Sequence, residues 1–544
     1  MTLLQDAVRT HARGRPDAVA LVGPGGERLT YRALEQASNC LARLLADVGC
    51  RRGDRVALLM PKLPAAIVAM LGVLKADAIY VPLDPAGPAA RLARMLEVSD
   101  CRAVLAAGPV WNMLRETLAA AKLAKPPAIG WLDEGVRIGD ETGPAPAFGL
   151  SDLASYPASA PESANTEEDV AHILFTSGST GLPKGVMITH RSVLRFIRWA
   201  NAYFGTAPGD RISQHPPFHF DLSTFDIYGT LSAGAELHLV PHELNLLPHK
   251  LAQFIRDARL TQWFSVPAAL NLMAKFDLVK PGDFPDLRRV LWDGEAIPTP
   301  TLIHWMRRLP HVRFTNLYGP TETTIASSYY TVPRPPSDPR APIPIGTACD
   351  GEALLVLDAE QQPVPPGELG EIYIRGAGLS PGYWRDPEKT RGAFVPCPGA
   401  EDPGERMYRT GDLGRKAADG LFHFAGRADS QIKSRGYRIE LGEIEAALGS
   451  LTGLQESAAV AIPSDEFETS LICCAYVAAR NGQASPDALR KGLAGLLPSY
   501  MLPTRWMRWD ALPRNANGKI DRPRLRTEFI RIEAQAPQAQ KRRA

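Results

Sequence analysis

The alternation of helix-like and strand-like segments near the N-terminus is the feature that most constrains the fold. Residues 29–48 (LTYRALEQASNCLARLLADV) place apolar side chains at helical spacing, with Thr30 as the expected N-cap. A strand-like segment follows at 55–60, then a helix near 64–76 and a β-rich segment at 78–84. Such alternation is typical of parallel strands covered by helices, so it predicts an α/β fold.

Length and composition narrow the class of protein. A chain of 544 residues is long enough for at least two domains, and 45% hydrophobic with 22% charged residues is typical of a soluble globular protein. The formal charge of +2 provides no field that would gather nucleic acid or an anionic membrane. The seven scattered cysteines contain no C-x-x-C pair, and the longest apolar run, 65–74, is too short to span a bilayer. A cytoplasmic enzyme with reduced thiols is expected.

Changes in composition suggest where the domains divide. Pro-rich and Gly-rich stretches at 141–165, 331–344 and 396–406 are typical of loops. After Gly426 a smaller α+β pattern begins, with a helix in ELGEIEAALGSL and strands in AAVAIP and LICCAYVAA. We therefore expect an N-terminal domain at 1–428, a C-terminal domain at 429–530 and a disordered tail at 531–544.

The segment 175–185, FTSGSTGLPKG, is the first candidate for binding a ligand. It lies between the strand-like AHIL and VMIT, and its backbone N–H groups and hydroxyls can surround a polyphosphate while Lys184 supplies a counter-charge. It does not have Walker A spacing. A flexible turn without a ligand is the alternative, and ten ordered positions argue against it. The candidate phosphate ligands are Thr176, Ser177, Gly178, Ser179, Thr180, Gly181 and Lys184.

With this loop the chain resembles the superfamily of acyl-CoA synthetases, nonribosomal peptide adenylation domains and luciferases, and in particular a stand-alone adenylation domain. The resemblance covers nearly the whole chain. The motifs that carry it follow in this order: LTYRAL (29–34), LKADAIYVPLD (74–84), FTSGSTGLPKG (175–185), FDLS (220–223), NLYGPTE (316–322), GELGEIYIRG (367–376), YRTGD (408–412), GRADSQIKSRGYRIELGEIE (426–445), LPSYMLP (497–503) and NGKID (517–521).

The resemblance implies a fold and a reaction. The implied fold has a large N-terminal domain, with two mixed β-sheets flanked by helices and a small β-barrel, and a small mobile α+β C-terminal domain. The implied reaction uses ATP and Mg²⁺ to form an aminoacyl-adenylate, and then loads a phosphopantetheine thiol in nonribosomal peptide biosynthesis. Only 25 residues follow Lys519, fewer than a carrier domain needs, so the expected acceptor is a separate carrier protein or coenzyme A. A monomer is expected.

The resemblance also assigns the nucleotide site. Tyr318 is expected to stack on adenine, Asn316 to meet the adenine edge, Thr321 to contact phosphate and Glu322 to bind Mg²⁺. These roles suit the residue types, because a hard cation prefers carboxylate and phosphate oxygens and an aromatic face suits a purine. Asp412 is expected to accept hydrogen bonds from the ribose hydroxyls beside Arg427. The remaining residues implied for the nucleotide site are Gly294, Glu295, Ala296 and Gly319.

Four residues of the C-terminal region are implied in the two half-reactions. Lys519 is the expected catalytic cation, because a carboxylate that attacks the α-phosphate of ATP must approach another anion. Asp429 is the expected hinge between the adenylating and thiol-transfer poses. Gly436 is expected to line the thiol tunnel, and Lys433 to act in the thiol-transfer pose.

The pocket for the acid is inferred from Asp221 of FDLS, which by resemblance pairs with the substrate ammonium. A buried carboxylate is costly without a cation, so an amine-bearing substrate is expected. The other pocket positions implied are Leu222, Phe225, Phe264, Leu291, Asp293, Leu317, Ile325 and Ala326, completed by Lys519.

This lining resembles that of ligases for proline, so proline or a related small cyclic amino acid is the first expectation. Asp293 departs from that pattern, and either meets a second amine or hydroxyl of the substrate or hydrogen-bonds to a wall residue. PFHFDLS (217–223) also resembles ligases for β-amino acids. Diamino acid ligases, acid-CoA ligases, a catalytically silent binding protein and an oxidative luciferase remain alternatives.

Overall fold

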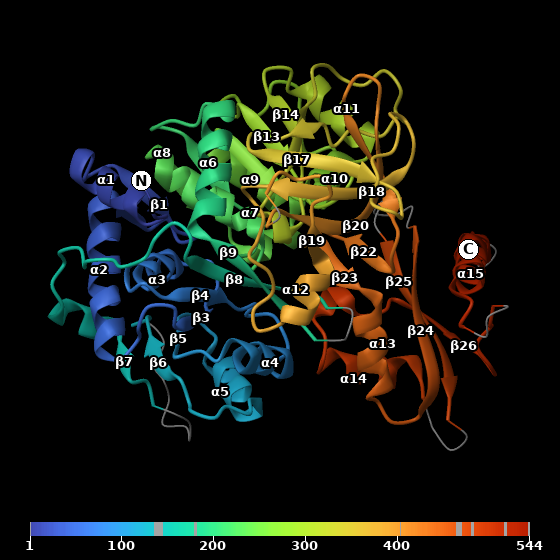
Figure 1. Cartoon of the computed structure of the whole chain (residues 1–544), viewed down its shortest axis with the longest axis horizontal. Helices are drawn as coiled ribbons and strands as arrows, with labels where there is room; N and C mark the ends of the chain where they lie inside the picture. The colour runs from blue at the N-terminus through green and yellow to red at the C-terminus, as the bar shows by residue number, and fades with distance from the viewer. Residues whose placement is uncertain are drawn as a thin grey trace. The chain divides into compact units, whose positions relative to one another are not determined.

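The computed structural model describes residues 2–134, 145–178, 182–402, 404–463, 470–479, 484–515 and 519–541, with side chains described to residue 534 (Figure 1). The chain divides into two compact units. Unit 1 comprises Met1–Pro85, Leu92–Phe175 and Gly185–Ala428. Unit 2 comprises Asp429–Ala544 together with two short segments from earlier in the chain, Ala86–Arg91 and Thr176–Lys184. No helix within the described ranges is both long enough and apolar enough to cross a bilayer.

The first sheet of unit 1 has seven strands in the order β7-β6-β5-β3-β4-β8-β9. The strand pairs from β7 through to β8 are all parallel. Its middle strands are apolar on both faces, as expected where helices cover a parallel sheet. The strands are β3 (Arg55–Leu59), β4 (Ile79–Pro82), β5 (Ala103–Ala106), β6 (Ala128–Trp131), β7 (Phe148–Gly149), β8 (Val170–Thr176) and β9 (Lys184–Thr189).

The second sheet has nine strands in the order β16-β15-β14-β13-β12-β10-β11-β1-β2. Strands β14 to β1 along this path pair in parallel, whereas β2, β15 and β16 pair antiparallel, so the sheet is mixed. Its strands are β1 (Val19–Val22), β2 (Arg28–Thr30), β10 (Arg211–Gln214), β11 (Glu236–Leu239), β12 (Gln262–Ser265), β13 (Arg289–Trp292), β14 (Arg313–Tyr318), β15 (Ser328–Thr331) and β16 (Thr347–Ala348).

A third sheet of five antiparallel strands stands where the small barrel was expected. Its strands are β17 (Glu352–Leu357), β18 (Gly370–Gly376), β19 (Phe394–Pro396), β20 (Arg406–Lys416) and β21 (Phe422–Arg427). Two large mixed sheets with helices and a third small sheet confirm the fold class expected from the sequence.

The helices of unit 1 begin where the sequence offers caps. Thr30 accepts a hydrogen bond from the backbone N–H of Ala33, which confirms it as the N-cap of α2, and Thr189 caps α6 in the same way. α3 packs along α2 and is buried all round. The helices are α1 (Asp6–Gly14), α2 (Tyr31–Asp47), α3 (Pro64–Lys75), α4 (Ala89–Ser99, whose first turn belongs to unit 2), α5 (Trp111–Ala120), α6 (His190–Phe204), α7 (Asp221–Thr224), α8 (Thr230–Ala233), α9 (Pro248–Asp257), α10 (Pro267–Lys275), α11 (Thr299–Arg308) and α12 (Pro387–Ala393). The short turns are η1 (Leu150–Ser155), η2 (Phe225–Gly229), η3 (His242–Leu246) and η4 (Thr321–Thr323).

Unit 2 has the α+β composition expected after Gly426. It contains a β-hairpin, a three-stranded sheet and helices that pack on that sheet. The helix and both strands expected from ELGEIEAALGSL, AAVAIP and LICCAYVAA are confirmed. The elements are β22 (Gln431–Ser434), β23 (Tyr437–Glu440), α13 (Leu441–Gly449), β24 (Leu454–Pro463), β25 (Ser470–Ala478), α14 (Pro486–Ala494), η5 (Ser499–Met501), β26 (Arg505–Arg508) and α15 (Arg522–Lys541).

The end of the chain corrects one expectation. The disordered tail expected at 531–544 is instead helical as far as Lys541, because α15 continues to that residue. Leu525 and Phe529, one turn apart, are buried against β24 and β25 and anchor the first half of the helix. That apolar pair was overlooked because the surrounding residues are mostly charged.

Candidate active site

Three adjacent strands of the nine-stranded sheet bring candidate site residues to one edge. β12, β13 and β14 are parallel neighbours, with Phe264 opposite Leu291 in register and Leu291 opposite Thr315. Leu317 and Tyr318 lie at the carboxyl end of β14, and Asp293 directly follows β13. Ligands of α/β proteins bind outside the carboxyl ends of such strands, so the structure supports a binding site at this edge.

Residues 221–233, called the pocket helix below, begin with the expected amine ligand. α7, the π-helical turn η2 and α8 follow one another without a break. Asp221 is the first residue and is 8% exposed, and Phe225 opens the π-helical turn. The ring of Phe225 lies 6.0 Å from that of Phe264 in an edge-on arrangement. The helix therefore carries Asp221 and Phe225 toward the end of β12.

The apolar residues proposed for the acid pocket share one hydrophobic cluster of unit 1. Each has an exposed fraction of 5% or less, as expected for side chains that line an enclosed site. They are Leu222, Phe225, Phe264, Leu291, Leu317, Ile325 and Ala326. The structure thus places all seven in one continuous core, although they come from well-separated segments of the sequence.

The backbone beside this cluster is strained. Thr324 and Ile325 have φ angles of 59° and 71°, and a β-branched residue rarely adopts this left-handed conformation. Gly319 faces the same turn, and a Cβ added there would lie 2.6 Å from the Cα of Ala326. Gly319 therefore permits a close approach of two backbones, which brings the end of NLYGPTE against the pocket residues Ile325 and Ala326.

Asp293 is buried, with an exposed fraction of 2%. Its carboxylate accepts a hydrogen bond from the backbone N–H of Gly294, whose φ of 93° requires glycine or strain. This hydrogen bond uses one oxygen of the carboxylate, and both sequence-based interpretations of Asp293 stay predictions. The hydrogen bond fixes the turn that presents Gly294, Glu295 and Ala296, of which Glu295 is half-buried and Ala296 exposed.

The carboxylate of Asp412 is held by two other candidate nucleotide ligands. Asp412 on β20 and Arg427 on β21 are opposite each other in register, and the guanidinium of Arg427 donates to one carboxylate oxygen. The hydroxyl of Tyr318 donates to the other at 2.7 Å. Burial and the nearby carboxylate raise the pKa of Tyr318, so the phenol stays protonated and donates. Asn316 instead donates its side-chain N–H to the carbonyl of Pro344 at 2.8 Å.

Glu322 is the candidate metal ligand. It is completely buried, and its carboxylate accepts a hydrogen bond from the hydroxyl of Tyr383 at 2.8 Å. Thr321 precedes it in the turn η4. Among the described residues no group of three or more His, Cys, Asp or Glu side chains could hold a metal. A single carboxylate suits a Mg²⁺ ion whose other ligands are mainly substrate phosphates and water. It does not suit a metal ion that is enclosed by protein ligands.

The candidate phosphate loop, FTSGSTGLPKG (175–185), belongs to unit 2 from Thr176 to Lys184. As expected, it connects β8 and β9: Thr176 ends β8 and Lys184 begins β9. The Ser177 hydroxyl donates to the carbonyl of Arg438 at 2.7 Å, and the Gly178 N–H lies 3.4 Å from the Glu443 carboxylate. Glu443 also forms an ion pair with Arg91. The candidate ligands Ser179, Thr180 and Gly181 lie outside the described residues.

The four residues implied in the half-reactions also lie in unit 2. Lys519 is exposed, and its backbone N–H donates to the side chain of Asn515 at 3.0 Å. Asp429 is exposed at the start of the unit's main segment and accepts from the backbone N–H of Gln431. Lys433 is half-buried on β22. Gly436, at a φ of 80°, lies in the turn between β22 and β23.

Sequence reasoning missed several residues that support the site. Tyr383 orients Glu322, and nothing in PGYWRD distinguishes it from an ordinary core aromatic residue. Asp226 is buried within the pocket helix, and Lys62 is buried near it. Each is a single charge within an apolar stretch (LLMPKLPAAI and FDIYG), which is a usable signal because an isolated charge in a core needs a reason.

Comparison with known proteins decides the family. The profile of the AMP-binding enzymes matches residues 8–384, more than half of the chain, and the profile of the AMP-binding enzyme C-terminal domain matches residues 443–519. The chain belongs to the AMP-binding enzyme family. This AMP-binding enzyme is 35% identical over 538 residues to the dimodular nonribosomal peptide synthase of Bacillus subtilis, a match that covers 96% of the chain and 21% of the synthase. The chain spans 6% to 21% of the length of the curated synthases that head its matches.

Solved structures agree with the profiles. The AMP-binding enzyme is similar to the Vibrio cholerae adenylation domain AlmE in complex with glycyl-adenosine-5'-phosphate, with a TM-score of 0.83, 26% identity and 97% of each chain covered. It is also similar to holo-PA1221, a protein with adenylation and PCP domains, with a TM-score of 0.76, 26% identity, and 96% of this chain and 84% of that chain covered. The resemblance found in the sequence motifs is confirmed. The chain is an adenylate-forming enzyme whose relatives are nonribosomal peptide synthetase adenylation domains.

Proposed function

We propose that the protein is an amino acid ligase that acts in two half-reactions. In the first, an oxygen of the amino acid carboxylate attacks the α-phosphorus of ATP, and pyrophosphate leaves as the aminoacyl-adenylate forms. In the second, a phosphopantetheine thiol attacks the acyl carbon, the thiol proton is lost and AMP leaves. The free energy of the mixed anhydride is thereby retained in a thioester.

The position of Asp221 is the observation that carries the proposal. It is a carboxylate with an exposed fraction of only 8%, at the start of a helix whose next residues enter an apolar cluster. A cation beside a buried carboxylate is attracted more strongly than it would be in water. The α-ammonium of an amino acid is such a cation, whereas an acid without an amine offers none.

The nucleotide end of the proposed site is supported by Asp412. A carboxylate has about four acceptor sites, so hydrogen bonds from Tyr318 and Arg427 leave capacity for ribose hydroxyls. We propose that Glu322, with Thr321 beside it, binds Mg²⁺, which would neutralise phosphate charge there.

Lys519 is proposed to bridge the substrate carboxylate and the α-phosphate, which would otherwise repel each other. It is proposed to do so when the C-terminal unit turns about Asp429, and Lys433 and Gly436 are proposed to serve the thiol-transfer pose. The exposure of Lys519 supports this role, because a side chain that enters the site only transiently is not tied down in the core.

The proposed acceptor is a carrier protein. PA1221 contains a PCP domain as well as its adenylation domain, which supports a carrier protein as the acceptor. The dimodular synthase is a far longer protein, and this chain covers about a fifth of it. Coenzyme A is the alternative acceptor. Incubation with ATP, the preferred amino acid and either holo carrier protein or coenzyme A, followed by mass spectrometry, distinguishes the two by which thiol gains the aminoacyl mass.

The proposed substrate is proline or a related small cyclic amino acid, because the pocket side chains are aromatic and aliphatic. AlmE, with glycyl-adenosine-5'-phosphate bound, is similar over the whole chain, so a small amino acid is consistent with the fold. Asp293 accepts the N–H of Gly294 through one carboxylate oxygen, so a second amine or a hydroxyl on the substrate stays an alternative. The panel of acids described next therefore also includes a β-amino acid and a diamino acid.

Pyrophosphate exchange over a matched panel tests the function. The panel pairs proline with cyclopentanecarboxylate, which keeps the ring and lacks the amine, and adds glycine, β-alanine and 2,3-diaminopropionate. We expect exchange with at least one amino acid and none with cyclopentanecarboxylate. Exchange with amine-free acids alone would overturn the assignment and favour an acid-CoA ligase.

A further inference from the structure

A buried lysine lies beside the pocket helix. Lys62, between β3 and α3, has an exposed fraction of 6%. Its ammonium donates a hydrogen bond to the carbonyl of Gln214 at 3.2 Å and a shorter one to the carbonyl of His215. β3 belongs to the seven-stranded sheet and Gln214 ends β10 of the nine-stranded sheet. Lys62 therefore connects the two large sheets of unit 1 at the carboxyl end of β10.

The chain that leaves this contact leads directly into the amine site. From Gln214 it turns through residues 215–220 to Asp221, and the side chain of Gln214 stabilises the turn by donating to the carbonyl of Pro216 at 2.5 Å. The hydroxyl of Ser223 then donates to the carbonyl of Phe220 at 2.6 Å. Lys62 thus holds the start of a short, hydrogen-bonded segment, and Asp221 is at its end.

The pocket helix itself presents a charge to Lys62. Asp226 lies in the π-helical turn next to Phe225, is 1% exposed, and makes no hydrogen bond to another described side chain. Burial raises the pKa of Asp226, and the nearby Lys62 ammonium and the backbone of His215 oppose that rise. Burial likewise lowers the pKa of Lys62 to about 7, and the nearby Asp226 opposes that fall. Each of the two groups therefore favours the charged form of the other.

The other side of the pocket helix is held by uncharged groups. Thr224 lies 3.5 Å from the Nε2 atom of His172, and the hydroxyl of Tyr228 donates to that of Tyr80 at 3.2 Å. Tyr80 and His172 are opposite each other in register on β4 and β8 and stack at 4.8 Å. The helix is therefore fixed between two sheets, and Lys62 supplies a positive charge near it.

We propose that Lys62 is a positioning residue for the amine-recognition site: by binding the end of β10 and compensating Asp226, it sets the helical turn that orients Asp221 and Phe225. Lys62 does not touch the substrate in this proposal. The inference rests on the proposed function in so far as Asp221 binds an amine. It extends that function to a residue outside the pocket lining.

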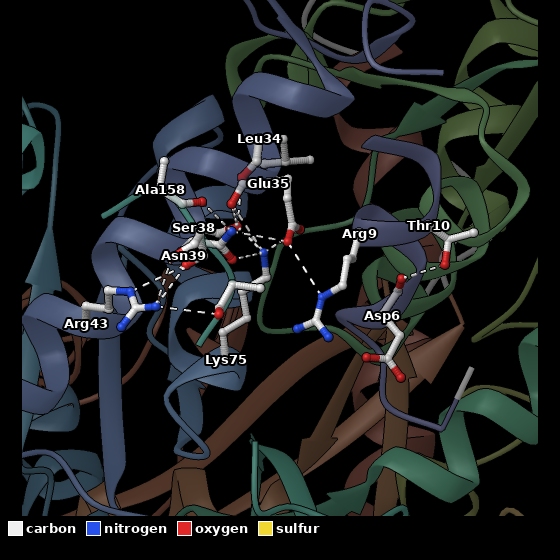
Figure 2. Close-up of polar contacts among 12 residues, drawn as sticks. Asp6, Arg9, Thr10, Leu34, Glu35, Ser38, Asn39, Arg43, Lys75 and Ala158 are labelled. Carbon is white, nitrogen blue, oxygen red and sulfur yellow. Dashed lines mark hydrogen bonds and ion pairs between the residues drawn. The ribbon is translucent and has the colours of Figure 1, made fainter. Parts of the chain in front are cut away.

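A second buried lysine provides a matched control. Lys75, on α3, is 2% exposed, and its ammonium contacts Glu35 at 2.5 Å, Asn39 at 2.7 Å and Ser38 at 2.8 Å. Figure 2 shows that these partners all come from α2, with Arg9 of α1 approaching Glu35 from the other side. None of these contacts involves a residue of the pocket helix. Lys75→Met therefore removes a buried lysine without touching the pocket helix.

The experiment measures pyrophosphate exchange as a function of amino acid and of ATP for wild type, Lys62→Met, Lys62→Arg, Asp226→Asn and Lys75→Met. We expect Lys62→Met to raise the KM for the amino acid by about tenfold or more while the KM for ATP changes by less than about twofold. Lys62→Arg keeps the charge and should recover most of the loss. Lys75→Met should lower the thermal midpoint without this selective change in KM.

Coupling between the two charges sharpens the test. Lys62→Met and Asp226→Asn together should raise the KM for the amino acid by less than the product of the single effects, because they remove one interaction. The proposal is overturned if the two KM values rise together, if Lys62→Arg is as impaired as Lys62→Met, or if the single effects multiply. If Lys62→Met does not fold, Lys62→Arg and Asp226→Asn still show whether the KM for the amino acid changes alone or together with the KM for ATP.

Failure of the proposed function would look different. The assays use whichever acid the wild type activates, so a wild type that accepts only amine-free acids refutes amine recognition. Selective KM changes for that acid would still show that Lys62 positions the pocket helix. Conversely, amino acid activation with an unchanged KM in Lys62→Met would leave the function intact and refute the positioning role.

Discussion

Asp412 connects Tyr318 and Arg427, two of the proposed nucleotide ligands, through one carboxylate. Because Arg427 and Tyr318 both donate to it, Asp412→Asn removes the charge that Arg427 compensates while it keeps the shape of the side chain. Hydrogen bonds to charged groups contribute about 1.5–3 kcal/mol, so we expect the KM for ATP to rise by about 10- to 100-fold. Asp419→Asn, an exposed change on the connection between β20 and β21, is the control for the assay. An unchanged KM for ATP in Asp412→Asn would remove the residue from the nucleotide site.

Asp221 should control which acid is accepted. Asp221→Asn keeps the size of the side chain and removes the negative charge that the substrate ammonium needs. Loss of one partner of a buried charge pair costs about 3–5 kcal/mol, so activation of the amino acid should fall by at least about 100-fold. The relative rate with an amine-free analogue of the same shape should rise. If discrimination between amine and analogue is the same in both proteins, Asp221 does not recognise the amine.

Lys519 should act in only one of the two half-reactions. Lys519→Ala removes a cation from the developing charge at the α-phosphate, and such losses typically cost about 2.7–4 kcal/mol, or two or more decades of rate. Transfer from synthetic aminoacyl-adenylate to the thiol should persist. Pyrophosphate exchange and single-turnover thiol loading measure the two steps, with exposed Lys491→Ala on α14 as the control. Equal loss in both steps would contradict the assigned role.

At the level of elements, helix caps offer a test that should leave the chemistry untouched. The hydroxyl of Thr30 accepts the N–H of Ala33 at the start of α2. Thr30→Ala should lower the free energy of unfolding by about 1 kcal/mol, whereas Thr30→Ser keeps the hydroxyl and should cost much less. Urea unfolding measures both, and the KM values should not change. A Thr30→Ser variant as unstable as Thr30→Ala would mean that the methyl group, and not the cap, matters.

The elements that could be predicted are those with a local signal. The helix at 31–47 and the strands β3 and β4 follow from periodicity and from an explicit cap, and the phosphate loop follows from its position between two apolar strands. The π-helical turn at Phe225–Gly229 had no such signal, because its geometry depends on packing between two sheets. The helix at 531–541 had no such signal either, because the residues there are mostly polar or charged.

The residues of the candidate site likewise divide into those with a local sequence signal and those without one. Motif residues such as Asp412 and Tyr318 could be named from the sequence, and the structure places them in hydrogen-bond contact. That Lys62 donates to the carbonyl of Gln214, and lies near enough to Asp226 to affect its pKa, depends on contacts between distant segments. Side-chain partners of this kind are not encoded in local spacing. They emerge only when two sheets enclose the same helix.

For the molecule as a whole, unit 1 contains three histidines held neutral by burial. Burial lowers the pKa of His172 to about 3, of His190 to about 4 and of His215 to about 3. His172 stacks on Tyr80, His190 accepts the N–H of Leu4, and the ring of His215 lies 4.7 Å from that of Trp263. Each lies where a charged imidazolium would be poorly solvated, so each opposes protonation of the folded protein.

This sets the response of stability to acid. In the unfolded chain these histidines take up protons below about pH 6.5, while in the folded protein they do so only near pH 3–4, so between these values the unfolded state binds more protons. Stability that is present above pH 6.5 is therefore lost as the pH falls, at about 1.4 kcal/mol per pH unit for each histidine. His172→Phe keeps a ring against Tyr80 and should remove about one third of that histidine slope. Urea unfolding midpoints at pH 7, 6 and 5 measure it, with exposed His249→Gln as the control. A slope in His172→Phe equal to that of the wild type would mean that His172 is already protonated in the folded protein and that its burial against Tyr80 does not exclude the charge.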